Sequence, residues 1–213
     1  DALNVRAICD LRRTDERTRE PTVWRSASTR ALYWDDGAQP PTIRAIATRH
    51  PNTASGMHAA MCDLYRALPD WMAPRMRDLF AHLAEDATPI IVHCAAGKDR
   101  TGVAIALLLA ALDVPYESIL ADYLATNRAG DFEQFILTRQ RSQLGLAVDH
   151  HPLLALPNDV RQVLFAADAA YLAAAFDHID KHCGGLANFL REHAGLSEQR
   201  HQQLRSTLLV NVP

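Results

Sequence analysis

The sequence predicts an α/β domain in which a short buried strand leads directly into a buried helix. Residues 88–92 form a short apolar stretch typical of a strand, and residues 103–110 form a longer apolar run typical of a buried helix. A second short apolar stretch at 5–9 predicts another strand. Most of the remaining chain carries apolar residues at helical spacing, so helices should outnumber strands.

The N-terminal part is expected to contain short elements separated by loops. A capped helical turn is predicted at 14–17, where Pro21 stops it. Short strands are predicted at 22–25 and 30–34. The segment 35–52 contains Asp-Gly and Pro-Pro pairs and is expected to be mostly loop.

From residue 53 onwards the chain is predicted to be mainly helical. Met57, Met61 and Leu64 recur at helical spacing, and the same pattern resumes beyond Pro69. Gly184-Gly185 is typical of a helix C-cap. The further helices expected lie near 101–112, 115–128, 131–143, 158–182 (where an interruption is allowed for), 185–193 and 197–209.

Length and composition indicate one domain spanning 1–213. The chain has 213 residues, 48% hydrophobic content and a net charge of −3, which suffices for one well-buried core. This charge balance does not favour a nucleic-acid partner. No apolar run has the length of a membrane span, so no stable membrane insertion is expected, and no signal peptide is seen. No cofactor is implied.

The cysteines do not form a disulfide framework. Cys9, Cys62, Cys94 and Cys183 are far apart, without a CxxC pair. A reducing, cytoplasmic location is therefore expected. The strand that holds Cys9 should neighbour the strand before Cys94, so two alternatives stand for Cys9: simple packing, or a protective disulfide.

The run His-Cys-Ala-Ala-Gly-Lys-Asp-Arg-Thr-Gly at 93–102 carries the functional prediction. A loop entering a helix offers unpaired N–H groups, and together with the helix dipole they favour an anion. Gly97 lets these donors converge, and Arg100 adds a planar fork for two phosphate oxygens. The same positive surroundings should lower the pKa of Cys94, giving a thiolate near neutral pH. These features predict a phosphate-ester site with a cysteine nucleophile.

The other residues of this run have supporting roles in the prediction. We expect His93 to orient the loop from beneath it, and Thr101 to hydrogen-bond the sulfur. His93 lacks the neighbours of a metal ligand, so no metal is expected there. The residues expected to bind the phosphate are Ala95, Ala96, Gly97, Lys98 and Thr101.

Other cysteine and phosphate chemistries explain the run less well. A nucleoside-triphosphate loop is excluded because Asp99 stands where Ser or Thr is needed and Val92 where the first Gly should be. A rhodanese-like sulfur carrier would not need Lys98 to Thr101. Arsenate or sulfur-transfer chemistry would need a partner thiol, for which Cys9 is the candidate. A catalytically silent phosphate-binding module would usually lose the nucleophile or the acid.

Residues 93–102 resemble the signature of the Cys-dependent protein tyrosine phosphatases. The Gly-Lys-Asp-Arg-Thr-Gly version is similar to a bacterial branch that includes the mycobacterial protein tyrosine phosphatase B type and tyrosine/serine phosphatases. Residues 5–21, 122–127 and 171–196 resemble other parts of that branch. The resemblance implies a small, mostly parallel central sheet flanked by many helices. It also implies phosphoric monoester hydrolysis through a phosphocysteine, on phosphotyrosine or also phosphoserine, with phosphoinositides as the alternative substrate.

The resemblance also implies that Asp99 is the general acid, beside the catalytic Cys94 and Arg100. A structural Asp99, pairing with Arg100 or capping the helix, is the alternative. Asp10 is the second candidate acid, or a brace of the loop. Lys98 is expected either to contact a neighbouring phosphate on an inositol ring or to be solvated.

Further residues match the branch more loosely. Asp122, Tyr123 and Asn127 are expected to support the cleft. Asp63 and Asp70 are expected to be solvated.

Two parts of the chain need separate comment: the segment before the first strand, which departs from the pattern of the branch, and the stretch 129–165, which has two possible interpretations. Members usually carry an Asn-Phe-Arg-Asp-Leu-Gly-Gly-like segment ahead of the first strand, so an N-terminal segment is expected to be missing and secretion is left open. The stretch 129–165 is expected to be a lid over the site or a plain helical insertion. The expected partner is a phosphorylated protein or a phosphoinositide.

Overall fold

The computed structural model describes residues 3–24, 29–35, 37, 42–85, 88–131, 133–135, 138 and 155–209. The strands described are β1 (Ala7–Asp10), β2 (Arg30–Leu32) and β3 (Ile90–His93), all parallel and in the order β2-β1-β3. The predicted α/β class with a small parallel sheet is confirmed.

The central strand β1 sets the register of the sheet. All four of its residues are buried, whereas β2 lies at the edge and is largely exposed. The last residue of β1, Asp10, pairs with the last residue of β3, His93. Ligands of such sheets bind beyond the carboxyl ends of the strands, and this is where the loop after β3 begins.

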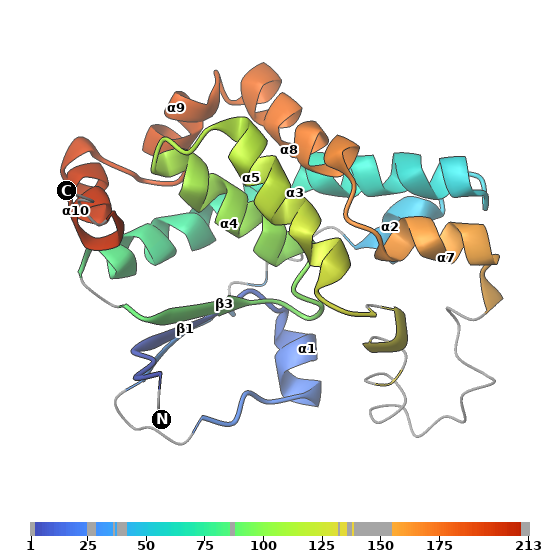
Figure 1. The fold of residues 1–213 in the computed structure, drawn as a ribbon, viewed down its shortest axis with the longest axis horizontal. Helices are drawn as coiled ribbons and strands as arrows, with labels where there is room; N and C mark the ends of the chain where they lie inside the picture. Colours follow the sequence, from blue (N-terminus) through green and yellow to red (C-terminus); the bar gives the residue numbers. More distant parts are fainter. Residues whose placement is uncertain are drawn as a thin grey trace.

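Helices make up most of the described chain. Figure 1 shows α3, α4, α5 and α8 stacked on one side of the sheet, with α1 on the other side near the end of β3. The helical elements are α1 (Thr14–Arg19), α2 (Ile43–Ala47), α3 (Ala54–Ala84), α4 (Asp99–Ala111), α5 (Tyr116–Ala125), η1 (Thr126–Arg128), α7 (Asn158–Phe165), α8 (Ala169–His182), α9 (Leu186–Asn188), η4 (Phe189–His193) and α10 (Glu198–Leu208). Within the described ranges, none of them has the length and apolar character needed to cross a membrane.

The long helix α3 forms the centre of the core. It runs without a break for 31 residues through Pro69 and Pro74, although each proline removes one backbone hydrogen bond. Apolar side chains along α3 are fully buried against the neighbouring helices, above all α8. This burial outweighs the cost of the two prolines, so the helical pattern predicted on both sides of Pro69 belongs to one helix.

Two of the local predictions in the N-terminal part are wrong. Residues 22–24 of the predicted strand 22–25 are not a strand, and α2 lies inside the predicted loop 35–52. The side chain of Thr42 accepts a hydrogen bond from the N–H of Ala45, and Ile46 is buried. A cap and one buried contact are enough to form this short helix against α3.

The C-terminal helices follow the prediction closely. The expected helix 158–182 is interrupted between α7 and α8, and Gly184 and Gly185 after α8 have φ of +72° and +90°. Most of the predicted helix 131–143 lies outside the described residues, as does most of the expected lid 129–165. The C-terminal end of the segment 129–165 is described and contains α7.

Candidate active site

The loop between β3 and α4 holds Cys94 at its base. The Cys94 side chain is buried, and residues 95–98 connect it to the first turn of α4. Gly97 has φ of +77°, a conformation that side-chain-bearing residues rarely adopt. Its N–H donates to the Cys94 Sγ at 3.2 Å. The loop therefore turns a backbone donor toward the sulfur.

Arg100 is held in place by two hydrogen bonds to one carboxylate. Its Nη1 and Nη2 donate to the two carboxylate oxygens of Glu16 at 2.7 and 3.0 Å, and Nη1 also donates to the carbonyl of Leu11 at 3.0 Å. Burial disfavours the charged guanidinium, but the hydrogen bonds to Glu16 and the electrostatic interactions with Cys94 and Glu16 raise the pKa of Arg100. Arg100 is therefore a fixed cation close to Cys94.

Glu16 is a site residue that the sequence prediction missed. It lies in α1, where its side chain also accepts the N–H of Arg13 at 2.8 Å, as in a capping box. Burial opposes its ionisation, yet the hydrogen bonds from Arg100 hold the pKa of Glu16 below its usual value. The capped turn was visible in the sequence, but its contact with a residue 84 positions away was not.

Asp99 is the first residue of α4, and its side chain is 27% exposed. Its carboxylate lies 2.7 Å from the Nζ of Lys98 and accepts the hydroxyl of Tyr65 at 2.9 Å. Because the single proton of Tyr65 goes to Asp99, the Tyr123 hydroxyl, 2.6 Å away, donates to Tyr65. The partners of Asp99 are thus Lys98 and Tyr65, and the alternative in which it pairs with Arg100 is not observed.

Lys98 is buried, so the expectation of a solvated lysine is wrong. Besides Asp99, its Nζ donates to the carbonyl of Ala166 at 3.1 Å and lies 5.9 Å from the ring centre of Tyr171. Burial of an ammonium is tolerated because a carboxylate and a carbonyl accept its hydrogen bonds. The side chain therefore points toward the connection between α7 and α8.

The connection between α7 and α8 is fixed by Asn127. Its side chain donates to the carbonyl of Ala167 and accepts the N–H of the same residue, each at 2.8 Å. Tyr123 is buried, and its ring would lie 2.9 Å from a Cβ added at Gly102. Tyr123 thus packs against the first turns of α4, Asn127 holds the connection between α7 and α8, and Asp122 is exposed; their expected role as supports of the cleft stays a prediction.

Asp10 is engaged by Arg12. The guanidinium of Arg12 donates to both carboxylate oxygens of Asp10, at 2.9 and 2.7 Å. Burial alone would raise the pKa of Asp10, but these hydrogen bonds outweigh it and hold the pKa below its usual value. A carboxylate kept ionised in this way braces the strand end and is a poor proton donor.

His93 differs from the prediction in its burial and Thr101 in its contact, while the role of His93 in orienting the loop stays a prediction. His93 is 29% exposed, not buried, and its Nδ1 lies 3.2 Å from the carbonyl oxygen of Cys94. The Thr101 hydroxyl is buried and makes no hydrogen bond to any described residue, so the expected bond to the sulfur is absent. Gly97 supplies the hydrogen bond that the sulfur accepts.

The four cysteines are all free thiols. Burial, and next the neighbouring Asp10, raise the pKa of Cys9 to about 12. Of the two alternatives for Cys9, the structure shows packing and not a disulfide.

Asp63 and Asp70 are on α3, away from the phosphate loop; Asp63 is half-buried and Asp70 is exposed. Asp63 pairs with His50 and Arg66, and Asp70 pairs with His178. They are therefore not candidates for the acid.

Comparison with known proteins identifies the family of this chain. A sequence model described as the tyrosine phosphatase family matches residues 1–210. The chain belongs to the tyrosine phosphatase family. This agrees with the resemblance at the phosphate loop and extends it along nearly the whole chain.

Individual relatives in this phosphatase family come from several bacteria. A protein of Cupriavidus necator, whose name assigns it provisionally to the tyrosine-protein phosphatases, is 38% identical over 66% of this chain. The triple specificity protein phosphatase PtpB of Mycobacterium tuberculosis is 32% identical over 82%, and a tyrosine-protein phosphatase of Nostoc commune is 28% identical over 97%. The matched regions cover 48%, 60% and 67% of these relatives, so the chain spans about half to two thirds of the proteins it resembles.

Proposed function

We propose that this chain hydrolyses phosphate monoesters through a phosphocysteine formed on Cys94. The observation that carries the proposal is the pairing of a buried Cys94 with an Arg100 whose guanidinium is held charged and oriented by Glu16. Around them, the start of α4 and the N–H of Gly97 favour an anion. A tetrahedral dianion is the ligand that suits this set of donors.

In the first step the Cys94 thiolate attacks phosphorus in line with the leaving oxygen. The S–P bond forms as the P–O bond of the ester breaks, and Asp99 gives its proton to the departing oxygen. Arg100 and the loop N–H groups stabilise the charge on the remaining phosphate oxygens. The products of this step are the free alcohol or phenol, phosphocysteine and the Asp99 carboxylate.

In the second step water attacks the phosphocysteine. Asp99, now ionised, takes a proton from the water, the new P–O bond forms, and the S–P bond breaks to restore the thiolate. The contacts with Tyr65 and Lys98 position the Asp99 side chain beside the loop, as the acid in the first step and as the carboxylate in the second. In this scheme Asp10 stays ionised and braces the strand end.

The proposed substrate is a phosphorylated protein, with phosphotyrosine first and phosphoserine second. The tyrosine-phosphatase names of the relatives support this order. Phosphoinositides are the third class to be measured, although the buried Lys98 no longer argues for them. A reducing, cytoplasmic setting suits the enzyme, because four free thiols include its proposed nucleophile.

The direct kinetic test is replacement of Cys94 by Ser with an aryl phosphate as substrate. We expect a loss in kcat of about a thousandfold or more, because the hydroxyl is not ionised near neutral pH. Cys62→Ser, at a buried thiol of α3, is the matched control and should retain activity. Substantial turnover by Cys94→Ser would contradict the mechanism.

The role of Asp99 has its own test. Asp99→Asn should slow esters with poor leaving groups more than those with good ones, because only a poor leaving group needs the proton. Equal losses on both classes would remove Asp99 as the acid while leaving Cys94 untouched.

A further inference from the structure

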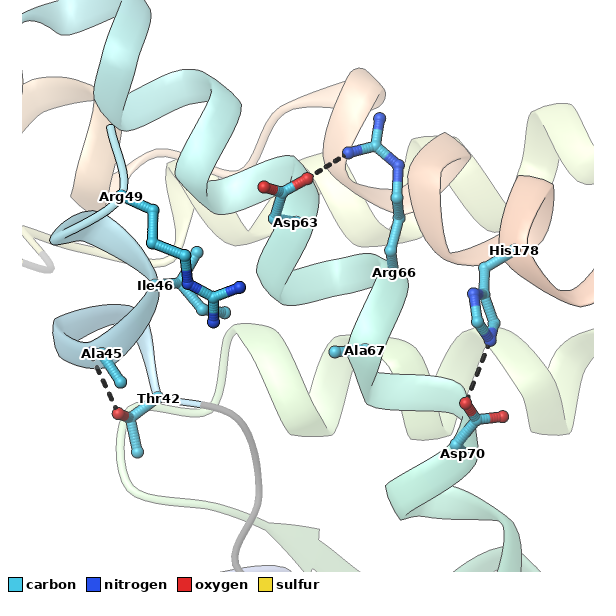
Figure 2. Close-up of a pocket in the computed structure, with 9 residues that line it drawn as sticks. All are labelled: Thr42, Ala45, Ile46, Arg49, Asp63, Arg66, Ala67, Asp70 and His178. Carbon is cyan, nitrogen blue, oxygen red and sulfur yellow. Dashed lines mark hydrogen bonds and ion pairs between the residues drawn. The ribbon is translucent and has the colours of Figure 1, made fainter. Parts of the chain in front are cut away.

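A second cluster of chemically active side chains lies far from the phosphate loop, between α3 and α8. Asp70 comes from α3, His178 from the last turns of α8, and Cys183 directly follows α8. One oxygen, one ring nitrogen and the sulfur of these residues lie within 4.8 Å of one another. The His178 Nε2 and an Asp70 carboxylate oxygen are 3.1 Å apart. Figure 2 marks this contact with a dashed line.

We propose that Asp70, His178 and Cys183 bind a zinc ion. Sulfur, imidazole nitrogen and carboxylate oxygen are the three donor types that zinc uses in proteins. A thiolate is a poor ligand for calcium or magnesium, which prefer oxygen. Binding would form Zn–S, Zn–N and Zn–O bonds; the thiol proton would leave to solvent, and His178 would bind as a neutral imidazole with its proton on the other ring nitrogen.

The geometry needs only a small contraction to accept the ion. Zinc–ligand bonds of about 2.0 to 2.3 Å place tetrahedral ligands roughly 3.5 Å apart. The side chain of Asp70 is 64% exposed and can adjust its rotamer, while His178 is 17% exposed and Cys183 is buried. Two ligands are thus anchored on α8 and the third is free to close on the metal.

The backbone of Cys183 is held by hydrogen bonds, whereas its thiol has no hydrogen-bond partner among the described residues. Its backbone N–H donates to the carbonyl of Ile179 at 2.9 Å, and the side chain of Asn188 donates to its carbonyl at 2.8 Å. Among the described residues the sulfur itself has no hydrogen-bond partner. The cluster also lies at the C-terminal end of α8, where the helix dipole favours a cation.

Solvent can reach the cluster from one side. Asp70 and His178 line a cavity of about 420 Å³, and Figure 2 shows both side chains at its edge. A water from this cavity could complete a tetrahedral site.

No sequence pattern indicated this site, because Asp70 is far along the chain from the other two ligands. Asp70 and His178 are 108 positions apart, and Asp70 was expected only to be solvated. A bound zinc would tie α3 to the end of α8, the two helices that pack together most extensively in the core. The site is independent of the proposed phosphatase activity.

Cobalt is the spectroscopic probe, and the full chain carrying Cys94→Ser is the starting protein. This background removes the loop thiol, which could itself bind a metal. Titration with Co²⁺ should give a thiolate-to-cobalt charge-transfer band that saturates at one ion per chain and disappears on addition of Zn²⁺. At a hundredfold excess over its Kd, zinc should also raise the Tm of this protein by about 5 °C or more.

Further substitutions in the same background locate the ion. Adding Cys183→Ser should abolish the band, whereas adding Cys62→Ser should leave it unchanged. Cys62 is the matched control because its sulfur also lies close to a histidine, 3.9 Å from the Nδ1 of His58. Absence of a band in Cys94→Ser, or its survival after Cys183→Ser, would overturn the proposal.

Substitution of the more exposed ligands keeps the test decisive if Cys183→Ser fails to fold. Asp70→Ala and His178→Ala should each weaken Co²⁺ binding by about tenfold or more, because each removes one ligand. Unchanged affinity in both variants would also rule out the site.

Discussion

Arg100 meets Glu16 through two parallel hydrogen bonds, of 2.7 and 3.0 Å, that join the start of α4 to α1. Both side chains are largely buried, at 14% and 15% exposed. A guanidinium anchored in this way presents its remaining donors in a fixed direction before substrate arrives. The orientation of the proposed phosphate-binding arginine therefore depends on a helix that precedes it by more than eighty residues.

Glu16→Gln should lower kcat/KM by about tenfold to a hundredfold. The variant keeps the shape of the side chain but replaces a charged bidentate pair by a weaker neutral contact, a loss of about 1.4 to 2.8 kcal/mol. Steady-state kinetics with an aryl phosphate measures the change. Asp15→Asn, the same chemical change on an exposed residue of α1, is the control. An unchanged kcat/KM in Glu16→Gln would show that Arg100 orients itself without this partner.

Tyr65→Phe should affect proton transfer more than phosphate binding. The variant removes the hydroxyl that donates to Asp99 and leaves Tyr123 without its acceptor. Burial, and next the charge of Asp99, raise the pKa of Tyr65 well above its usual value, so it stays a neutral donor. We expect about a tenfold loss with poor leaving groups, a smaller loss with good ones, and a stability loss of about 1 to 3 kcal/mol. Tyr33→Phe, at an exposed tyrosine, should change neither quantity; a loss independent of the leaving group would argue against the role of Tyr65.

Lys98→Met should slow every substrate by a similar factor. The ammonium contacts Asp99 and the carbonyl of Ala166, so its loss disturbs the acid and not a second phosphate site. We expect about a tenfold decrease in kcat/KM for phosphotyrosine, phosphoserine and phosphoinositide substrates alike. A loss confined to phosphoinositides would restore the inositol-binding role suggested by the sequence.

Asp10→Asn should reduce the loss in the free energy of unfolding that occurs at acidic pH. The hydrogen bonds from Arg12 hold the folded-state pKa of Asp10 below its usual value despite burial. Their contribution is therefore fully present above the unfolded value of about 3.9 and is lost as the pH falls through the lower folded value. Denaturant unfolding from about pH 6 to about pH 3 should show a smaller decrease for the variant than for the wild type.

Glu16 also makes stability decrease at acidic pH, because its folded-state pKa is lowered too. This contribution is the same in the wild type and in Asp10→Asn. Only the difference between the two profiles reports on Asp10. Parallel profiles would mean that the pair with Arg12 does not stabilise the fold.

Local sequence patterns predicted the phosphate loop well because its chemistry is contiguous. Cys94, Gly97 and Arg100 lie within seven residues, and the strand and helix that frame them are set by unbroken apolar runs. Local sequence patterns also allowed for the interruption between α7 and α8. By contrast, α2 depends on a cap at Thr42 and a buried contact of Ile46 with α3. The composition of this segment is typical of a loop and therefore does not predict the helix.

Contacts between distant elements were beyond the sequence patterns. The acidic partner of Arg100 lies in α1, and Tyr65 reaches Asp99 from α3. The burial of Lys98 follows from the position of Ala166, which no local pattern encodes. The predicted hydrogen bond from Thr101 to the Cys94 sulfur was wrong for a related reason. The position of Thr101 next to the loop in the sequence does not determine which donor contacts the sulfur.

Trapping the covalent intermediate tests the central claim most directly. Asp99→Asn should slow release of the phosphoryl group, so acid quenching during turnover of an aryl phosphate, followed by digestion and mass spectrometry, should capture it. The account predicts one phosphoryl group on the peptide that contains Cys94, and none when Cys94 is also replaced by Ser. A phosphoryl group on another residue, or turnover that continues without Cys94, would contradict it.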